Sequence, residues 1–355
     1  MRTKHYFGYY GEWVGVKLGA VSYSTQQKIM QRNWQILLKE VITDPAKLLD
    51  QLELNSNLLP AAQRAAKLFP LRVPVGFLDR MQKGNPYDPL LQQVLPLAAE
   101  EIVSFGYSQD PLLEKSVNPL PGLLHKYHGR VLLTITGACA INCRYCFRRH
   151  FPYTENRAGG KAWQNILTYI QADTSISEVI FSGGDPLLAS DEYLHHCVED
   201  LASIAHVKIL RIHSRLPIVL PERISAELIN WFTASRLQPI LVTHSNHANE
   251  CDDSVQQAIE KLRLKKVHVL NQAVLLKGVN DNVAALVNLS ERLFACGILP
   301  YYLHLLDKVQ GAAHFTVPEE QAKQLITTLR DRLPGYLVPK CVYEQDGASS
   351  KVPVI

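Results

Sequence analysis

Residues 130–146 of the chain read RVLLTITGACAINCRYC, and this stretch does more than any other to set the fold. Its first half is a short apolar run rich in β-branched residues, which predicts a buried strand. Three cysteines, Cys139, Cys143 and Cys146, follow directly in the pattern C-x3-C-x2-C. In barrels of parallel strands the chemistry collects at the carboxyl ends of the strands. We therefore expect the three thiols at the mouth of such a barrel.

The alternation that begins with this strand continues through the rest of the chain. Short β-branched runs alternate with longer amphipathic stretches, which indicates repeated β-α units around a parallel sheet. The predicted strands cover residues 130–137, 178–184, 207–214, 238–245, 266–276 and 300–306. The predicted helices cover residues 162–171, 191–204, 221–232, 254–264, 283–295 and 318–333. Six units are too few for a closed eightfold barrel, so the sequence predicts an α/β fold built as a partial (β/α)6 barrel.

The chain divides into four parts by its local pattern. Residues 1–23 give no clear signal and are interpreted as an extension of unclear role. Residues 24–125 contain helical stretches interrupted by prolines and are predicted to form a helical N-terminal region that leans on the barrel. The barrel itself is assigned to residues 126–335, and residues 336–355 to a C-terminal strand and a short final segment.

Composition excludes several classes of function. The 355 residues are 47% hydrophobic, so a large core is expected, but no apolar run is as long as a membrane span. The start of the chain lacks the apolar core and cleavage site of a secretory signal, and we expect a cytoplasmic protein. A formal net charge of +4 is too small for a nucleic-acid-binding surface. The one dense basic cluster lies among the cysteines and comprises Arg144, Arg148, Arg149 and His150.

The cysteine spacing favours an iron–sulfur cluster. Three thiolates on one loop suit a 4Fe-4S cluster and leave one iron open for another ligand. A zinc site is the alternative, but zinc usually takes two separated pairs of ligands. With Tyr145 before the last cysteine, the motif resembles the signature of the radical S-adenosylmethionine (SAM) superfamily. The other four cysteines lie in apolar or helical segments, where a small buried hydrophobic residue is the more common role.

A glycine-rich turn after the second predicted strand strengthens this resemblance. Ser182, Gly183, Gly184 and Asp185 stand where radical SAM enzymes have a turn that meets the amino group of SAM. Glycine suits such a turn because the backbone approaches the ligand closely when no Cβ lies in the way. On its own the pair of glycines indicates only a tight turn.

Longer motifs resemble one family within that superfamily, the lysine 2,3-aminomutases. They are CRYCFRR, SGGDPLL, RIHSRLPIVLPERI, THSNHANE, NQAVLLKGVND and PYYLHLLDKVQGAAHF, within a match over roughly residues 70–355. The resemblance implies an isomerase that moves the α-amino group of L-lysine to the β-carbon. It implies three cofactors: the 4Fe-4S cluster, SAM and pyridoxal 5'-phosphate (PLP).

The resemblance also assigns a PLP site. Lys351, in the C-terminal DGASSKVPVI, matches the lysine that binds PLP as an imine in this family. Without the family pattern, a lysine so close to the end would be read as a solvated tail residue. Lys126 and Arg130 fall where the family places basic residues for the PLP phosphate, although Lys126 replaces an expected arginine.

Substrate contacts follow from the same pattern. Arg148 matches the partner of the substrate carboxylate, and Asp307 matches a partner of the distal ammonium. Glu344 stands at the second acidic position, where an aspartate is expected. His244 and Gln272 match positions near SAM and PLP, although either residue alone would more often be a hydrogen-bonded core residue.

Three features favour the branch that makes (R)-β-lysine for the modification of translation elongation factor P. They are the end of the chain soon after Lys351, the glutamate at position 344, and the N-terminal region. This branch implies an external electron donor and a functional link to an elongation factor P ligase, with no nucleic acid and no membrane as partner. The alternatives are an aminomutase of lysine degradation or osmolyte synthesis, and a non-catalytic iron–sulfur protein.

Overall fold

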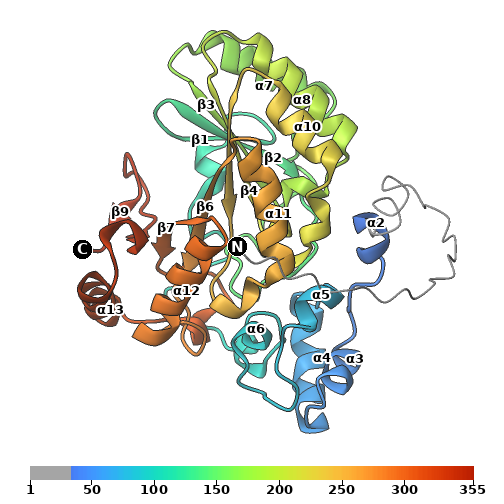
Figure 1. The fold of residues 1–355 in the computed structure, drawn as a ribbon, viewed down its shortest axis with the longest axis vertical. Helices are drawn as coiled ribbons and strands as arrows, with labels where there is room; N and C mark the ends of the chain where they lie inside the picture. The colour runs from blue at the N-terminus through green and yellow to red at the C-terminus, as the bar shows by residue number, and fades with distance from the viewer. Residues whose placement is uncertain (1–32) are drawn as a thin grey trace, which may run out of the picture.

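The computed structural model describes residues 33–355. The extension predicted for residues 1–23 and the first part of the helical N-terminal region lie outside the described residues. From residue 33 the chain forms short helices that pack together as a group beside the barrel (Figure 1). They are α2 (Trp34–Leu37), α3 (Pro45–Gln51), α4 (Leu59–Leu68), α5 (Val75–Leu78) and α6 (Pro89–Gln92).

Local sequence sets where these helices begin. The Asp44 side chain accepts a hydrogen bond from the backbone of Ala46, and Pro45 at the first helical position needs no such partner. Asp88 does the same for α6, where its carboxylate accepts from two backbone amides. The prolines that interrupt this region therefore start helices as well as end them.

A single sheet forms the centre of the described chain. Its nine strands follow sequence order, and those from β2 to β8 are parallel. The two edge strands, β1 and β9, run antiparallel to their neighbours and do not pair with each other, so the barrel is open. The strands are β1 (Leu123–Tyr127), β2 (Arg130–Thr136), β3 (Glu178–Gly183), β4 (Ile209–Ser214), β5 (Gln238–Thr243), β6 (His268–Val274), β7 (Leu299–His304), β8 (Lys340–Tyr343) and β9 (Val352–Pro353).

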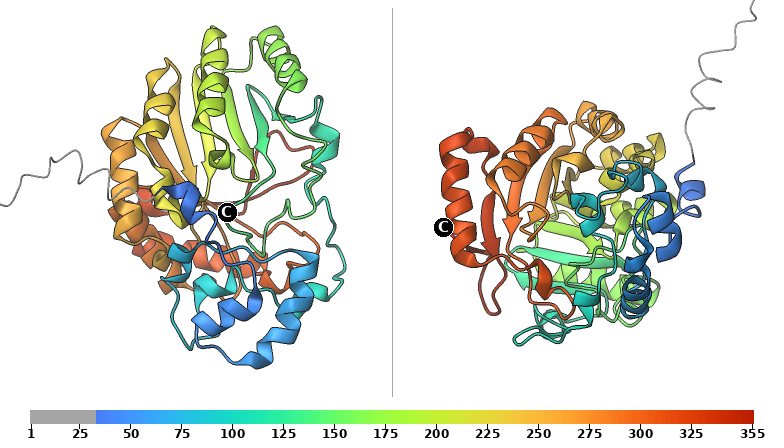
Figure 2. Two further views of the ribbon diagram at one scale, coloured as in Figure 1. Left: turned by 90° about the vertical axis from the view of Figure 1, so that its right-hand side faces the viewer. Right: turned by 90° about the horizontal axis from the view of Figure 1, so that it is seen from below.

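Helices cover the outer face of this sheet (Figures 1 and 2). The long ones are α7 (Lys161–Ala172), α8 (Asp191–Ser203), α10 (Ala226–Ala234), α11 (Asp253–Leu264), α12 (Val283–Ala295) and α13 (Glu319–Arg332). The short α9 (Leu216–Val219) follows β4. Single 3-10 turns are η1 (Ser56–Leu58), η2 (Ala98–Glu101), η3 (Glu114–Val117), η4 (Pro186–Leu188), η5 (Pro221–Arg223), η6 (Ala248–Glu250), η7 (Ala313–Phe315) and η8 (Gly335–Leu337).

The predicted β-α alternation is confirmed, with two corrections. The helix predicted for residues 221–232 is split into η5 and α10, because Ser225 accepts from Leu228 and caps a new helix start. The strand β1 was not predicted and crosses the expected boundary at residue 126. No described helix is both long enough and apolar enough to cross a membrane.

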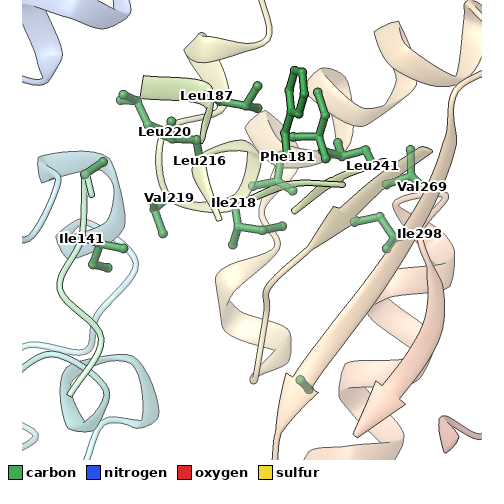
Figure 3. Packing of buried hydrophobic residues seen from close by; sticks show 14 of the residues in the cluster. Ile141, Phe181, Leu187, Leu216, Ile218, Val219, Leu220, Leu241, Val269 and Ile298 are labelled. Carbon is green, nitrogen blue, oxygen red and sulfur yellow. The ribbon is translucent and has the colours of Figure 1, made fainter. Parts of the chain in front are cut away.

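The core lies between the sheet and its helices. Figure 3 shows Phe181 of β3 and Leu241 of β5 beside Leu187 and Leu216, which follow two of the strands. Ile141, from the cysteine loop itself, is 4% exposed and belongs to the same apolar cluster. Burial of this side chain fixes the loop against the body of the protein.

Candidate functional site

A cavity of about 1240 Å³ runs along the inner face of the sheet, from the cysteine loop at the carboxyl ends of the parallel strands to Arg130 and Glu178 at their amino ends. Pockets for one small molecule usually measure about 300–1,000 Å³, so this cavity has room for more than one ligand. Its lining includes every residue that the sequence analysis named as a candidate ligand, cofactor or substrate contact. They are Lys126, Arg130, Cys139, Cys143, Cys146, Arg148, Ser182, Gly183, Gly184, Asp185, His244, Gln272, Asp307, Glu344 and Lys351.

The three motif cysteines are free thiols on one side of this cavity. Burial and the nearby Cys143 raise the pKa of Cys146 to about 12, and burial also raises the pKa of Cys139. No three His, Cys, Asp or Glu side chains of residues 33–355 converge closely enough to surround a single metal ion. The ligands of a four-iron cluster bind different irons and need not converge on one point, so a loop of three thiols fits a cluster.

The cysteine loop is fastened to the N-terminal region by its backbone. The amide of Asn142 donates to Arg72 O at 3.0 Å, and that of Arg144 donates to Gln93 O at 2.9 Å. The Asn142 side chain donates to Pro70 O at 2.9 Å. The helical N-terminal region therefore forms part of the wall that holds the motif.

A buried carboxylate reinforces this attachment. Glu100, from the N-terminal region, accepts from the Arg144 guanidinium on both oxygens and from Arg149 at 2.8 Å. The side chains of Glu100 and Arg144 are fully buried. Removing one partner of such a pair would leave an uncompensated buried charge, which usually destabilises a protein by about 3–5 kcal/mol.

The glycine-rich turn lies against the start of the cysteine loop. A Cβ on Gly184 would lie 2.4 Å from Ala138 O, and Gly183 has φ of +114°, which favours glycine. The Asp185 carboxylate accepts from the Ser214 hydroxyl at 2.7 Å and from the amide of Arg215 at 2.8 Å. Asp185 thus ties the turn to the end of β4, and the rest of the turn faces the cavity.

Arg148 also lines the cavity, and a carboxylate that the sequence analysis did not single out holds it. Glu114 of η3 accepts from its Nε at 2.8 Å and its Nη2 at 2.6 Å. The Nη1 of Arg148 lies 3.2 Å from the Ser182 hydroxyl. Glu114 binds the edge of the planar guanidinium that is formed by Nε and Nη2. The edge between Nη1 and Nη2 remains available to other groups.

The opposite side of the cavity is formed by the C-terminal strands and by β1. Glu344 accepts from Lys351, from the Tyr127 hydroxyl, and from Lys126 at 2.9 Å. Although burial alone would raise it, the Lys351 ammonium and these hydrogen bonds lower the pKa of Glu344 to about 2. Lys351 Nζ also lies 5.7 Å from the centre of the Tyr302 ring.

Two of the charged groups that the sequence analysis named on this side have no hydrogen-bond or ion-pair partner among the described residues. The Asp307 carboxylate is one of them, and burial followed by the nearby Glu344 raises its pKa to about 7. The Arg130 guanidinium is the other, and it lies 4.9 Å from the centre of the Tyr127 ring. A half-buried carboxylate and a guanidinium without hydrogen-bond or ion-pair partners fit a ligand that carries both a cation and an anion.

The floor of the cavity carries uncharged imidazoles. Burial lowers the pKa of His244 to about 3 and also lowers those of His213 and His304. His244 Nε2 is 2.8 Å from the Gln272 amide. The Nε2 atoms of His213 and His304 are buried without a hydrogen-bond partner. The lowered pKa values mean that these three side chains carry no charge near neutral pH.

Many residues that the sequence analysis did not assign to the site also line it, and four of them bear on its chemistry. Glu114 gave no signal because it lies in an irregular segment, whereas His213 and Arg215 belong to the polar residues at the end of a strand. Tyr302 reads as an ordinary strand residue. The four other cysteines are buried, as predicted, and one of them, Cys341, also lines the cavity.

Comparisons with known proteins agree with the geometry. Residues 133–289 match the family model described as the Radical SAM superfamily. An L-lysine 2,3-aminomutase of Escherichia coli (strain K12) is 52% identical, with 91% of this chain and 95% of that protein covered. One from Haemophilus influenzae is 50% identical over 90% of this chain and 95% of that protein. One from Clostridium subterminale is 34% identical over 91% of this chain and 78% of that protein.

Proposed function

The chain belongs to the lysine 2,3-aminomutase family of radical SAM enzymes, and on that basis we propose how its residues divide the work. It is an isomerase that acts on L-lysine. We propose that it uses PLP together with the cluster and SAM, and that its product, (R)-β-lysine, serves to modify elongation factor P in the cytoplasm. The observation that carries the proposal is one cavity with three thiols on one side and Lys351 on the other.

The cysteine side fits the cluster and SAM. Cys139, Cys143 and Cys146 would hold three irons, and the glycine-rich turn at Gly183 and Gly184 would let SAM approach the backbone. When bound, the cluster and SAM together supply the radical that removes a hydrogen atom from the substrate. The buried wall around the loop excludes water from this chemistry.

The C-terminal side fits PLP. Lys351 would bind its carbonyl carbon, and Arg130, which has no hydrogen-bond or ion-pair partner among the described residues, would bind its phosphate. When bound, PLP spreads the unpaired electron while the nitrogen moves between carbons. Lys126 is held by Glu344, so we assign the larger share of phosphate binding to Arg130.

The substrate spans the two sides. The free edge of Arg148 would bind the lysine carboxylate, while Glu114 fixes the plane of the guanidinium. Asp307 would bind the distal ammonium, because a half-buried carboxylate without a hydrogen-bond or ion-pair partner gains most from a matching cation. Glu344 would share that ammonium once Lys351 has turned to the coenzyme, since both amines are lysine ammonium groups.

Glu344, one of the three features that favour the elongation factor P role, is part of a paired change. Lys126 and Glu344 are the two positions where the chain departs from the family pattern, and their side chains form an ion pair at 2.9 Å. The two departures therefore compensate for one another. Together they change the part of the cavity that would bind the coenzyme and the distal end of the substrate. The role also implies an external electron donor and a ligase that consumes the product as partners.

The proposal is tested by incubating the anaerobically reconstituted protein with L-lysine, SAM, PLP and a reductant. Chiral analysis should show (R)-β-lysine, and omission of PLP should abolish it. The product should then be accepted by an elongation factor P ligase better than α-lysine. If β-lysine forms without PLP, the coenzyme assignment is wrong. If the ligase does not prefer the product, the elongation factor role is wrong.

A further inference from the structure

Arg215 directly follows β4 and is the cation that contacts a cysteine of the motif. Its Nη1 donates to Cys143 Sγ at 2.7 Å and to the Tyr145 hydroxyl at 2.9 Å. The Arg215 side chain is 5% exposed, so water screens this contact very little. Tyr145 is the aromatic residue of the cysteine motif, so the guanidinium contacts the loop at two points.

Three other parts of the chain hold the guanidinium in place. Its Nη2 donates to Glu250 Oε2 at 2.9 Å and to Gln93 Oε1 at 2.7 Å. The ring of Phe77 lies below it, with its centre 5.4 Å away. Glu250 is itself fixed, because it accepts from the backbone amides of Asn246 and His247. Arg215 is therefore preorganised toward the Cys143 sulfur.

The other arginines that line the cavity or flank the cysteines have different partners. Arg148 is paired with Glu114, and Arg211 is paired with Glu178 at 3.1 Å. Arg144 and Arg149 are both bound to Glu100. Among these arginines of the described chain, Arg215 alone donates a side-chain hydrogen bond to a motif sulfur. Arg215 therefore differs from the neighbouring arginines in its contact with a cysteine of the motif.

We propose that Arg215 is a positioning residue for the Cys143 ligand and that it raises the reduction potential of the cluster. The inference rests on the proposed cluster site. Hydrogen bonds to ligand sulfurs and nearby charge are known determinants of iron–sulfur potentials. One electron from the external donor adds negative charge to the cluster and its thiolates. A guanidinium that donates to Cys143 stabilises that added charge, so the reduced form is favoured.

The test compares three variants by redox titration followed by electron paramagnetic resonance, without lysine or PLP. Arg215→Met is combined with Glu250→Gln, so that no buried carboxylate is left without its cation. Arg215→Lys keeps a cation at the position. Arg211→Gln, combined with Glu178→Gln for the same reason, removes a cation of β4 that contacts no motif sulfur, and serves as the matched control. Iron content is measured for each protein after reconstitution.

We expect the Arg215→Met double variant to load iron and to have a more negative potential than the wild type. A tenfold loss of preference for the reduced form corresponds to about 59 mV for one electron. Arg215→Lys should recover part of the shift, and the Arg211→Gln control should show none. An Arg215→Met double variant that loads no iron while Arg215→Lys loads fully would also support the positioning role.

Two results would overturn the inference. One is a fully loaded Arg215→Met double variant with the wild-type potential. The other is an equal shift in the Arg211→Gln control, which would assign the effect to the general charge of the cavity. A wild-type protein that holds no 4Fe-4S cluster would instead overturn the proposed cluster site, and the two failures are therefore distinguishable.

Discussion

The two sides of the cavity are built in opposite ways. On the cysteine side, each of four arginines is bound to a carboxylate: Arg144 and Arg149 to Glu100, Arg148 to Glu114, and Arg215 to Glu250. On the C-terminal side, Asp307 and Arg130 lack such partners among the described residues. There, Glu344 alone is shared by two lysines and a tyrosine.

The difference indicates different tasks. A charge network that is complete within the protein holds its members in one geometry, as a cluster and its SAM contact require. Groups that lack a hydrogen-bond or ion-pair partner in the protein, as Asp307 and Arg130 do, can bind a charged ligand without first breaking such a contact. We therefore assign fixed chemistry to the cysteine side and ligand exchange to the C-terminal side.

The largest expected effect lies on the cysteine side. Cys143→Ala should abolish reductive cleavage of SAM, because three thiolates are the set that leaves one iron open. The amount of 5'-deoxyadenosine formed under anaerobic conditions measures this. Cys197→Ala, at a buried position of α8, is the control and should leave cleavage unchanged. Normal cleavage by Cys143→Ala would remove the basis of the cluster assignment.

The next effect lies on the C-terminal side and tests whether lysine is recognised by its tail. Asp307→Asn should raise the KM for lysine about a hundredfold or more, since a buried ammonium without its carboxylate loses about 3–5 kcal/mol. Norleucine, which lacks the distal amine, should be a poor substrate of the wild type. If Asp307→Asn turns over lysine normally, the ammonium is bound elsewhere.

The dependence of KM on pH also tests whether Asp307 binds the ammonium of lysine. Burial and the nearby Glu344 raise the pKa of Asp307 to about 7, and only its ionised form attracts an ammonium. At pH 6, about a tenth of Asp307 is ionised, so KM should fall about tenfold as the pH rises from 6 to 8. Glu344, with its pKa near 2, stays ionised throughout. Steady-state kinetics of Asp307→Asn should lose this dependence, and its persistence there would assign it to another group.

The smallest effect concerns the orientation of Arg148. Glu114→Gln keeps the shape of the side chain but weakens its hold on the guanidinium, and we expect KM for lysine to rise about fivefold with little change in kcat. Glu101→Gln, whose partner Arg64 is exposed, is the control and should change neither constant. A lower KM in Glu114→Gln would mean that Glu114 competes with the substrate carboxylate instead of orienting its partner.

The sequence alone predicts the cysteine side of the cavity better than the C-terminal side. The cysteine loop can be recognised from the sequence because its three cysteines lie within eight residues and directly follow a predicted strand. Lys351 is recognised only through its resemblance to a family, because nothing in its local sequence distinguishes it from a tail residue. The placement of both at one cavity follows from the parallel order of the strands.

The residues that support the site could not be predicted in this way. Glu114 is 34 positions from Arg148, and Cys143 is 72 positions from Arg215. Such pairs depend on how the N-terminal region packs against the barrel, and a single sequence carries no periodic signal for them. Glu344 was predicted as a substrate contact, and its hydrogen bonds with Lys351 and Tyr127 appear only in three dimensions.

The most direct test of the division between the two sides is one set of assays on Lys351→Ala, with Lys323→Ala, a surface residue paired with Glu319, as control. The three readouts are cluster content, SAM cleavage in the presence of lysine, and β-lysine formed with PLP present. We predict that Lys351→Ala keeps its cluster and its SAM cleavage, loses the visible absorbance of bound PLP and makes no β-lysine, while the control matches the wild type. Formation of β-lysine by Lys351→Ala at the wild-type rate would contradict the account.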